Sequence, residues 1–193
     1  MVHPLISYTA VFVIALSESL AVVGLLVPGT LLLLSIGALV GSGGLSWQLT
    51  MLLAILGAIA GDSISYWLGF HYQQHIKSLW PLRTHPNIIA RGEMFFQRHG
   101  GKSVFLGRFV GPIRPIIPLV AGMMKMSPRY FLGVNVLSAI IWAGAYLFPG
   151  VLLAGWLQAL DDGRQIVILV ALVLALLWLS FWLSRTILRI IIS

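Results

Sequence analysis

Two arginines lie inside one apolar stretch of this 193-residue chain. Packing alone does not explain why charged residues occur there. Arg108 and Arg114 lie within residues 105–124, FLGRFVGPIRPIIPLVAGMM, where no other residue is charged. An arginine at the centre of a bilayer costs about 3 kcal/mol even on a lenient insertion scale. Each therefore needs an acid, water or a bound anion, and we take this requirement as a sign of function.

The same stretch is rich in residues that break helices. Gly111 and Pro112 are followed by Pro115 and Pro118. A proline removes a backbone donor and clashes with the preceding turn. A helix that begins near Ser103 is therefore predicted to fail by Gly111 and to resume only after Pro118, so that the chain enters the membrane, turns and leaves on the same side.

The break frees the two arginines from helical geometry. Six residues apart on a continuous helix, Arg108 and Arg114 would lie about 120° from each other. Across a break, both guanidiniums can converge on one anion. The planar guanidinium suits bidentate recognition of phosphate. The residues themselves therefore predict binding of a phosphate group.

Two acids lie in other apolar runs. Glu18 is in the run 8–40 and Asp62 is in the run 47–70. One interpretation is that they neutralise the arginines as buried pairs that only fix the fold. The alternative is that a phosphate competes with the carboxylates for the arginines and that protonation of a carboxylate gates the exchange. We expect Glu18 and Asp62 to balance charge or couple protons.

Composition places the chain in a membrane. It is 59% hydrophobic and 9% charged, whereas about a quarter of residues are charged in soluble domains. Apolar runs recur along the whole length, which predicts one membrane domain over residues 1–193 and no cleaved signal peptide. The sequence contains no cysteine, which excludes disulfides and cysteine nucleophiles.

The first apolar run, 8–40, is interrupted by Pro28 and Gly29, with Thr30 next. The run is too long for a single crossing, which needs about twenty residues. The Pro-Gly pair is therefore predicted to be the apex of a first re-entrant element. A loop over residues 41–46 follows.

A cleaner span is predicted over residues 47–70. Within it, Asp62, Tyr66 and Gly69 recur at helical spacing and share one stripe. Gly61 adds a small residue that permits close packing of another backbone. We expect Gly61 and Tyr66 to be structural.

The interval 71–102 is polar, and residues 84–100 within it are predicted to form an amphipathic helix from Pro86 to His99, stopped by Gly100 and Gly101. Its basic residues are Lys77, Arg83, Arg91, Arg98 and Lys102. A short basic loop is typical of the cytoplasmic side. We expect it to touch anionic lipid headgroups rather than nucleic acid.

Three further elements complete the predicted fold. They are a second re-entrant element over 103–125, a span over 130–156 broken late by Pro149 and Gly150, and a C-terminal transmembrane helix over 165–184. With the polar interval and the C-terminus cytoplasmic, the two broken elements dip in from opposite sides. The fold class is then an all-α membrane protein with two opposed re-entrant hairpins in an inverted repeat, about three full transmembrane helices and a cytoplasmic amphipathic helix.

Several short motifs, in order and at fitting spacing over residues 8–155, resemble the DedA family of bacterial membrane proteins, which shares its domain with eukaryotic lipid scramblases of autophagy. The matching residues are Glu18, Pro28-Gly29, Gly61-Asp62, Tyr66, Gly69, Gly107-Arg108-Phe109, Gly111-Pro112, Arg114, Pro118, Ala121-Gly122 and Trp142. The resemblance implies two opposed re-entrant hairpins in a bacterial inner membrane. It also implies transport of undecaprenyl phosphate or a related lipid, driven in some members by the proton motive force.

By the same resemblance, the family's functional glutamate falls on Glu18 and its two arginines fall on Arg108 and Arg114. Several members carry an acid directly after the Pro-Gly of the first hairpin, where this chain has Thr30. Asp62 is the candidate for the missing carboxylate.

Other functions were weighed against a flippase. An intramembrane lipid phosphatase needs a nucleophile with a base, yet all five histidines lie outside the apolar runs and no metalloprotease or serine-elbow motif is present. His71 and His75 have helical metal spacing but lack further ligands. We therefore expect no enzyme activity, metal or cofactor. An energy-independent scramblase, an assembly factor and a homo-oligomer stay open as alternatives.

Overall fold

The structure, a computed structural model, describes residues 4–21, 23–25, 29–77, 86–110 and 113–158. Throughout these ranges the regular elements are helical, seven α-helices and a 3₁₀ turn, which confirms the all-α class. The predictions made on Pro28, Gly111, Pro112 and the helix 165–184 lie outside the described residues.

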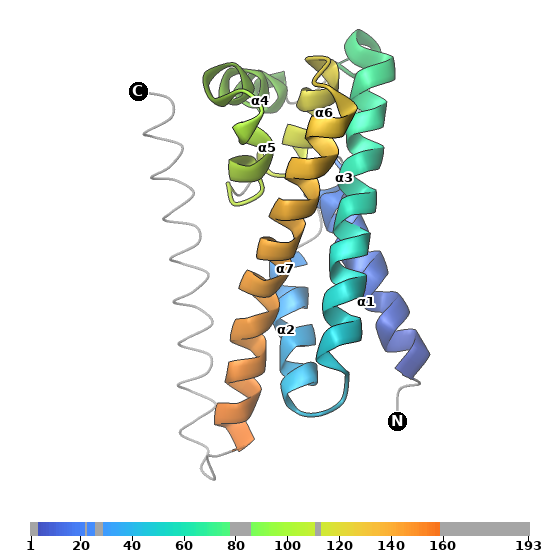
Figure 1. Cartoon of the computed structure of the whole chain (residues 1–193), viewed down its shortest axis with the longest axis vertical. Helices are drawn as coiled ribbons and strands as arrows, with labels where there is room; N and C mark the ends of the chain where they lie inside the picture. The colour runs from blue at the N-terminus through green and yellow to red at the C-terminus, as the bar shows by residue number, and fades with distance from the viewer. Residues whose placement is uncertain (1–3, 22, 26–28, 78–85, 111–112, 159–193) are drawn as a thin grey trace.

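Two long helices form the centre of the fold. Helices α3 (Trp47–Lys77) and α7 (Pro128–Gln158) have 31 residues each and pack against each other (Figure 1). The segments Trp47–Tyr72 and Pro128–Gly155 have the length and hydropathy to cross a bilayer, as predicted for these two spans. Their outer faces carry exposed apolar side chains, including Leu52, Leu56, Trp67, Leu137, Ile141 and Phe148.

The predicted late break in the second span is wrong. Helix α7 continues through Pro149 to Gln158. A proline inside a transmembrane helix is tolerated when neighbouring elements compensate for the lost hydrogen bond. Helix α2 packs along this part of α7, where Gly150 lies directly against the Leu34 carbonyl and Gly37. The Pro-Gly pair is thus a close packing site rather than the end of a helix.

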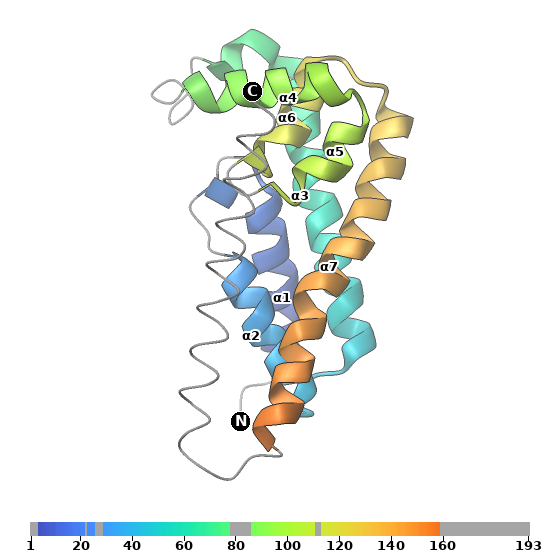
Figure 2. The ribbon, with the colours of Figure 1, turned by 90° about the vertical axis from the view of Figure 1, so that its left-hand side faces the viewer.

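The first broken element consists of α1 (Pro4–Ser19), the 3₁₀ turn η1 (Val23–Leu25) and α2 (Gly29–Gly41). Neither helix reaches the twenty or so residues that a crossing needs. In both ribbon views the chain rises through α1, reverses and descends through α2 beside the lower part of the long helices (Figures 1 and 2). Helix α1 packs mainly on α3, and α2 packs on α7.

The second broken element is shorter, with α5 (Lys102–Gly107) and α6 (Ile116–Met123) beside the upper part of the long helices (Figure 2). Helix α6 packs on α3, and α5 packs on α7. The helix resumes at Ile116 rather than after Pro118, which corrects that prediction. Pro118 lies in the first turn of α6, where backbone N–H groups have no intrahelical partner and the missing donor costs little.

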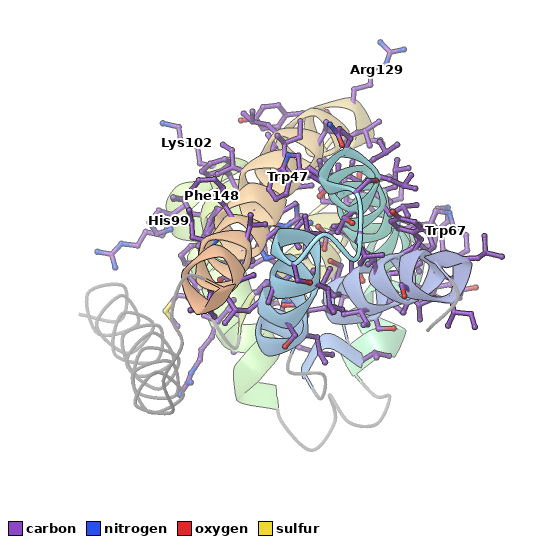
Figure 3. All side chains as sticks on the ribbon, turned by 90° about the horizontal axis from the view of Figure 1, so that it is seen from below. Trp47, Trp67, His99, Lys102, Arg129 and Phe148 are labelled. Atoms are coloured by element: carbon purple, nitrogen blue, oxygen red, sulfur yellow. The ribbon has the colours of Figure 1, made fainter. Side chains whose placement is uncertain are left out.

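Helix α4 (Pro86–His99) has the predicted bounds and lies across the end of the molecule nearest α5 and α6 (Figures 1 and 2). Its apolar face is used within the protein, because Ile89 and Phe95 are buried in clusters with residues of α6. Beyond α4, Lys102 and Arg129 extend outward from the ribbon (Figure 3). This end of the molecule therefore carries exposed basic side chains.

Candidate functional site

Among the described residues, four charged side chains that are buried or nearly so form two ion pairs. Arg108 pairs with Asp62, and Arg114 pairs with Glu18. Asp62 is the central residue of the 31-residue α3, and Glu18 is in the last turn of α1. All four predicted residues therefore come together at mid-height between the long helices, from three separate parts of the chain.

Both arginines lie at the break that the sequence predicted. Arg108 caps the C-terminal end of α5, and Arg114 precedes Pro115, the residue from which α6 begins. With the helix interrupted between them, the two guanidiniums reach acids on different elements. This is the freedom that the spacing of glycine and prolines indicated.

Arg108 is held on several sides. Besides Asp62, its guanidinium donates to Ser138 Oγ at 3.2 Å and to the Asn135 carbonyl at 3.4 Å, both on α7. The side chains of Arg108 and Asp62 are 3% and 8% exposed. A buried charge with this many partners is well compensated.

Arg114 is held less completely. Its side chain donates from Nη1 to Glu18 Oε1, while Arg114 Nη2 and Glu18 Oε2 are buried with no hydrogen-bond partner among the described residues. The Arg114 side chain is 12% exposed, four times the value for Arg108. Buried polar groups are usually satisfied. The second pair therefore has spare donor and acceptor capacity.

Trp142, next to the midpoint of α7, lies under both cations. The Cζ atom of Arg114 is 4.5 Å from the centroid of its ring, and that of Arg108 is 5.5 Å away. The side chain is fully buried. Cation–π attraction at a desolvated site is worth about 2 kcal/mol. Trp142 thus links the two ion pairs, a role that the sequence analysis did not assign to it.

The end of α1 is fixed by α3. The backbone N–H of Ala21 donates to Ser65 Oγ at 2.9 Å, and the Ser65 hydroxyl donates to the Gly61 carbonyl at 2.9 Å. Gly61 itself faces the Leu16 carbonyl so closely that a side chain there would clash. These contacts hold Glu18 at the height of Asp62.

The turns of the two broken elements touch each other. A β-carbon added at Gly24, in η1, would lie 3.0 Å from Cβ of Pro115. Ala21 also packs in a buried cluster with Ile116 and Leu119 of α6. The two elements thus meet at the ion pairs.

The remaining predicted structural residues are only partly described. Tyr66 donates from its hydroxyl to the Met126 carbonyl and stacks on Phe131 with ring centroids 4.1 Å apart, so it ties α3 to the start of α7. Gly29 and Thr30 begin α2. The Thr30 side chain lies outside the described residues.

The sequence analysis missed the α7 side of the site. Asn135, Ser138 and Trp142 stand three and four residues apart, which places them on one helical face in an otherwise apolar span. That polar stripe was the signal that identifies them. Ser65, three residues after Asp62 on α3, was also missed.

Taken together, the two guanidiniums and two carboxylates of the site have no net charge, and each arginine is already paired with an acid. Within the part of the chain that the structure describes, no group of three His, Asp, Glu or Cys side chains is placed to hold a metal ion.

Comparison with known proteins gives consistent matches. The family profile of the VTT domain matches residues 27–152. The inner membrane protein YabI of Escherichia coli (strain K12) is 37% identical over 180 residues, covering 92% of this chain and 70% of YabI. The protein DedA of the same strain is 30% identical over 179 residues, covering 88% of this chain and 78% of DedA.

A membrane protein of Mycobacterium tuberculosis (strain CDC 1551 / Oshkosh), named as uncharacterized, is 30% identical over 204 residues, covering 96% of this chain and 88% of the relative. No solved structure matches the chain significantly.

Proposed function

Since this chain belongs to the VTT domain (DedA) family of membrane proteins, we propose that it translocates a lipid phosphate across the bacterial inner membrane. Undecaprenyl phosphate or a related phospholipid is the proposed substrate, and the surrounding membrane lipids are its other partners. The proposal includes no enzymatic step, no cofactor and no nucleic acid.

The observation that carries the proposal is the pair of buried arginines at the break between α5 and α6. Both are paired with acids from other elements, and Arg114 keeps an unused donor. Arginine binds the oxygens of a phosphate through two parallel N–H groups. In the proposed cycle, the phosphate group takes the place of a carboxylate at an arginine.

The displaced carboxylate then needs a new counter-charge. A proton supplies it at the least structural cost, because an ionised carboxylate without a partner is strongly disfavoured in the bilayer interior. Glu18 is the proposed proton acceptor, and Asp62 is the second. Binding of lipid phosphate is thereby coupled to protonation.

The proposed membrane arrangement makes α1–α2 and α5–α6 two re-entrant hairpins that enter from opposite faces. The contacts support an inverted repeat: α1 packs on α3 as α5 packs on α7, and α2 packs on α7 as α6 packs on α3. Broken helices that meet near the midplane are typical of transporters with inverted repeats. The C-terminal helix 165–184 is the third proposed crossing.

The polar interval 71–102 and the C-terminus are proposed to be cytoplasmic, since cytoplasmic loops carry an excess of Lys and Arg. A single cysteine introduced as Gln97→Cys, on the exposed side of α4, tests this orientation. An impermeant thiol reagent should label it only after cells are opened. Rapid labelling on intact cells reverses the assignment.

Reconstitution into liposomes tests the function. Labelled undecaprenyl phosphate is incorporated, and translocation is followed by the accessibility of its phosphate group. Arg114→Lys and Arg108→Lys keep the charge but lose the planar fork, and each lost charge-assisted bond is worth about 1.5 to 3 kcal/mol. Both variants should translocate about tenfold more slowly or worse.

Arg129→Lys is the matched control, because Arg129 is exposed at the basic end of the molecule. It should behave as the unsubstituted protein. Full translocation by both the Arg108 and Arg114 variants would reduce these arginines to structural counter-ions.

Glu18→Gln separates proton coupling from binding. The amide keeps the shape of the side chain and cannot ionise. Translocation by this variant should no longer respond to a pH gradient, while lipid phosphate still binds. If translocation by the unsubstituted protein is itself indifferent to the gradient, the protein is an energy-independent scramblase. If no lipid moves, an assembly factor is the better description.

A further inference from the structure

One buried hydrogen-bond donor at the centre of the fold lacks an acceptor among the described residues. Trp142 is fully buried, and its indole Nε1 has no hydrogen-bond partner among the described residues. A buried tryptophan normally finds an acceptor for this N–H. The donor lies inside the membrane domain, where bulk water does not compensate for the missing bond.

A second unused donor is next to the first. Arg114, whose Nη2 is buried without a partner in the described part of the chain, has its Cζ atom 4.5 Å from the centroid of the Trp142 ring. Among the described residues, the side-chain partner of this guanidinium is Glu18, the carboxylate that a ligand would displace. Two N–H donors from different elements are thus available at one place.

We propose that Trp142 is a third binding group for the phosphate, with its indole N–H donating to a phosphate oxygen beside Arg114. This inference rests on the proposed function and names a substrate-binding residue on α7 in addition to the arginines. The ring also keeps the Arg114 guanidinium in place by cation–π contact when Glu18 releases it.

The donor set selects a chemical class of substrate. The Arg114 fork bonds two oxygens, so the indole N–H has a third oxygen to itself in a monoester but has to share an already bonded oxygen in a diester. A phosphate monoester offers three terminal oxygens, whereas a phosphodiester offers two. Trp142 therefore favours lipid monoesters, such as a polyprenyl phosphate, over ordinary diester phospholipids. The indole adds this preference without adding charge to a neutral site.

The direct readout is the indole N–H signal of Trp142 in the full chain, labelled with ¹⁵N-tryptophan in detergent micelles. The chain has seven tryptophans, and Trp142→Phe assigns the signal by removing it. Farnesyl phosphate is the monoester probe, and a short-chain phosphatidylglycerol is the diester probe. The monoester should shift the Trp142 signal downfield, as donation to an anionic oxygen does, and the diester should leave it in place.

Affinity supplies the second measurement. Trp142→Phe retains an aromatic face and loses the N–H, so farnesyl phosphate should bind about tenfold more weakly, as expected for one lost hydrogen bond to a charged group. Binding of the diester should stay within about twofold of its starting value on the same reasoning. Trp67→Phe is the control, because Trp67 is 51% exposed on the outer face of α3.

The outcomes separate the two proposals. If the unsubstituted chain binds farnesyl phosphate but the Trp142 signal stays in place and Trp142→Phe binds equally well, the inference is overturned and the proposed function stands. If the unsubstituted chain binds no lipid phosphate, the proposed function fails with it. If Trp142→Phe does not fold, variants of the other six tryptophans assign the signal by elimination, and the shift alone decides.

Discussion

The two ion pairs have the same composition, one arginine and one acid, but very different surroundings. Both terminal nitrogens of Arg108 are bonded, Nη2 to Asp62 and Nη1 to Ser138 and Asn135. Arg114 is bonded to Glu18 by one nitrogen, and one atom on each partner is without a hydrogen bond in the described part of the chain. The first pair therefore has more hydrogen-bond partners than the second.

The difference indicates which arginine can exchange its partner with less disturbance of the structure. A ligand that binds Arg108 has to break bonds to two long helices, α3 and α7. A ligand that binds Arg114 has to displace one carboxylate at the end of α1. The second exchange disturbs less structure, so Arg114 and Glu18 are the expected site of ligand entry, and Arg108 and Asp62 are the expected anchor.

The largest expected difference between the pairs is in stability. Removing one partner of a buried ion pair costs about 3 to 5 kcal/mol. Arg108→Met and Arg114→Met both leave an acid unpaired, but the Arg108 variant also loses two further hydrogen bonds, worth about 1 kcal/mol each. Arg108→Met should therefore unfold at the lower denaturant concentration in detergent. Equal losses would show that the two pairs are energetically alike.

A smaller effect, which differs between the two acids, is expected in the affinity for lipid phosphate. Glu18→Gln weakens the competitor for Arg114, and the change from a charge-assisted to a neutral bond is worth about 1 kcal/mol, or about fivefold tighter binding of farnesyl phosphate. Asp62→Asn loosens the anchor and should bind the lipid no more tightly. Titration of both variants in detergent measures this, and tighter binding by Asp62→Asn instead would exchange the roles of the pairs.

The smallest effect tests the hydrogen bonds that α7 makes to Arg108. Ser138→Ala removes one neutral partner of Arg108 and should lower the free energy of unfolding by about 1 kcal/mol, with translocation in liposomes changed less than about twofold. Ser63→Ala, beside Asp62 on α3, is the matched control. A large loss of translocation in Ser138→Ala would place Arg108, rather than Arg114, in the exchange step.

Much of the local structure could be predicted from the sequence. Pro86 starts α4 and the glycines at 100 and 101 stop it, because a proline suits a first helical turn and Gly100 has φ +57°, a conformation that costs glycine little. The loop 41–46 and the all-helical class were predicted on similar grounds. These features depend on neighbouring residues and on composition alone.

Where tertiary contacts compete with local preference, the sequence-based predictions failed. Pro149 was expected to break a span, and the helix continues because α2 packs against α7 at Gly150. Pro118 was expected to precede a helix, and it lies in the first turn, where its missing donor is harmless. The helix-breaking tendency of proline is local, but its cost depends on what surrounds it.

For the site, the sequence alone determined that Glu18, Asp62, Arg108 and Arg114 are out of place in an apolar interior, because the cost of a charge in a bilayer depends on residue type and depth. Only the tertiary structure decided which acid faces which arginine, since the partners are 46 and 96 residues apart. It also placed Trp142 under both cations. Contacts between distant segments follow from the packing of α1, α6 and α7 around α3, and no spacing along one segment contains that information.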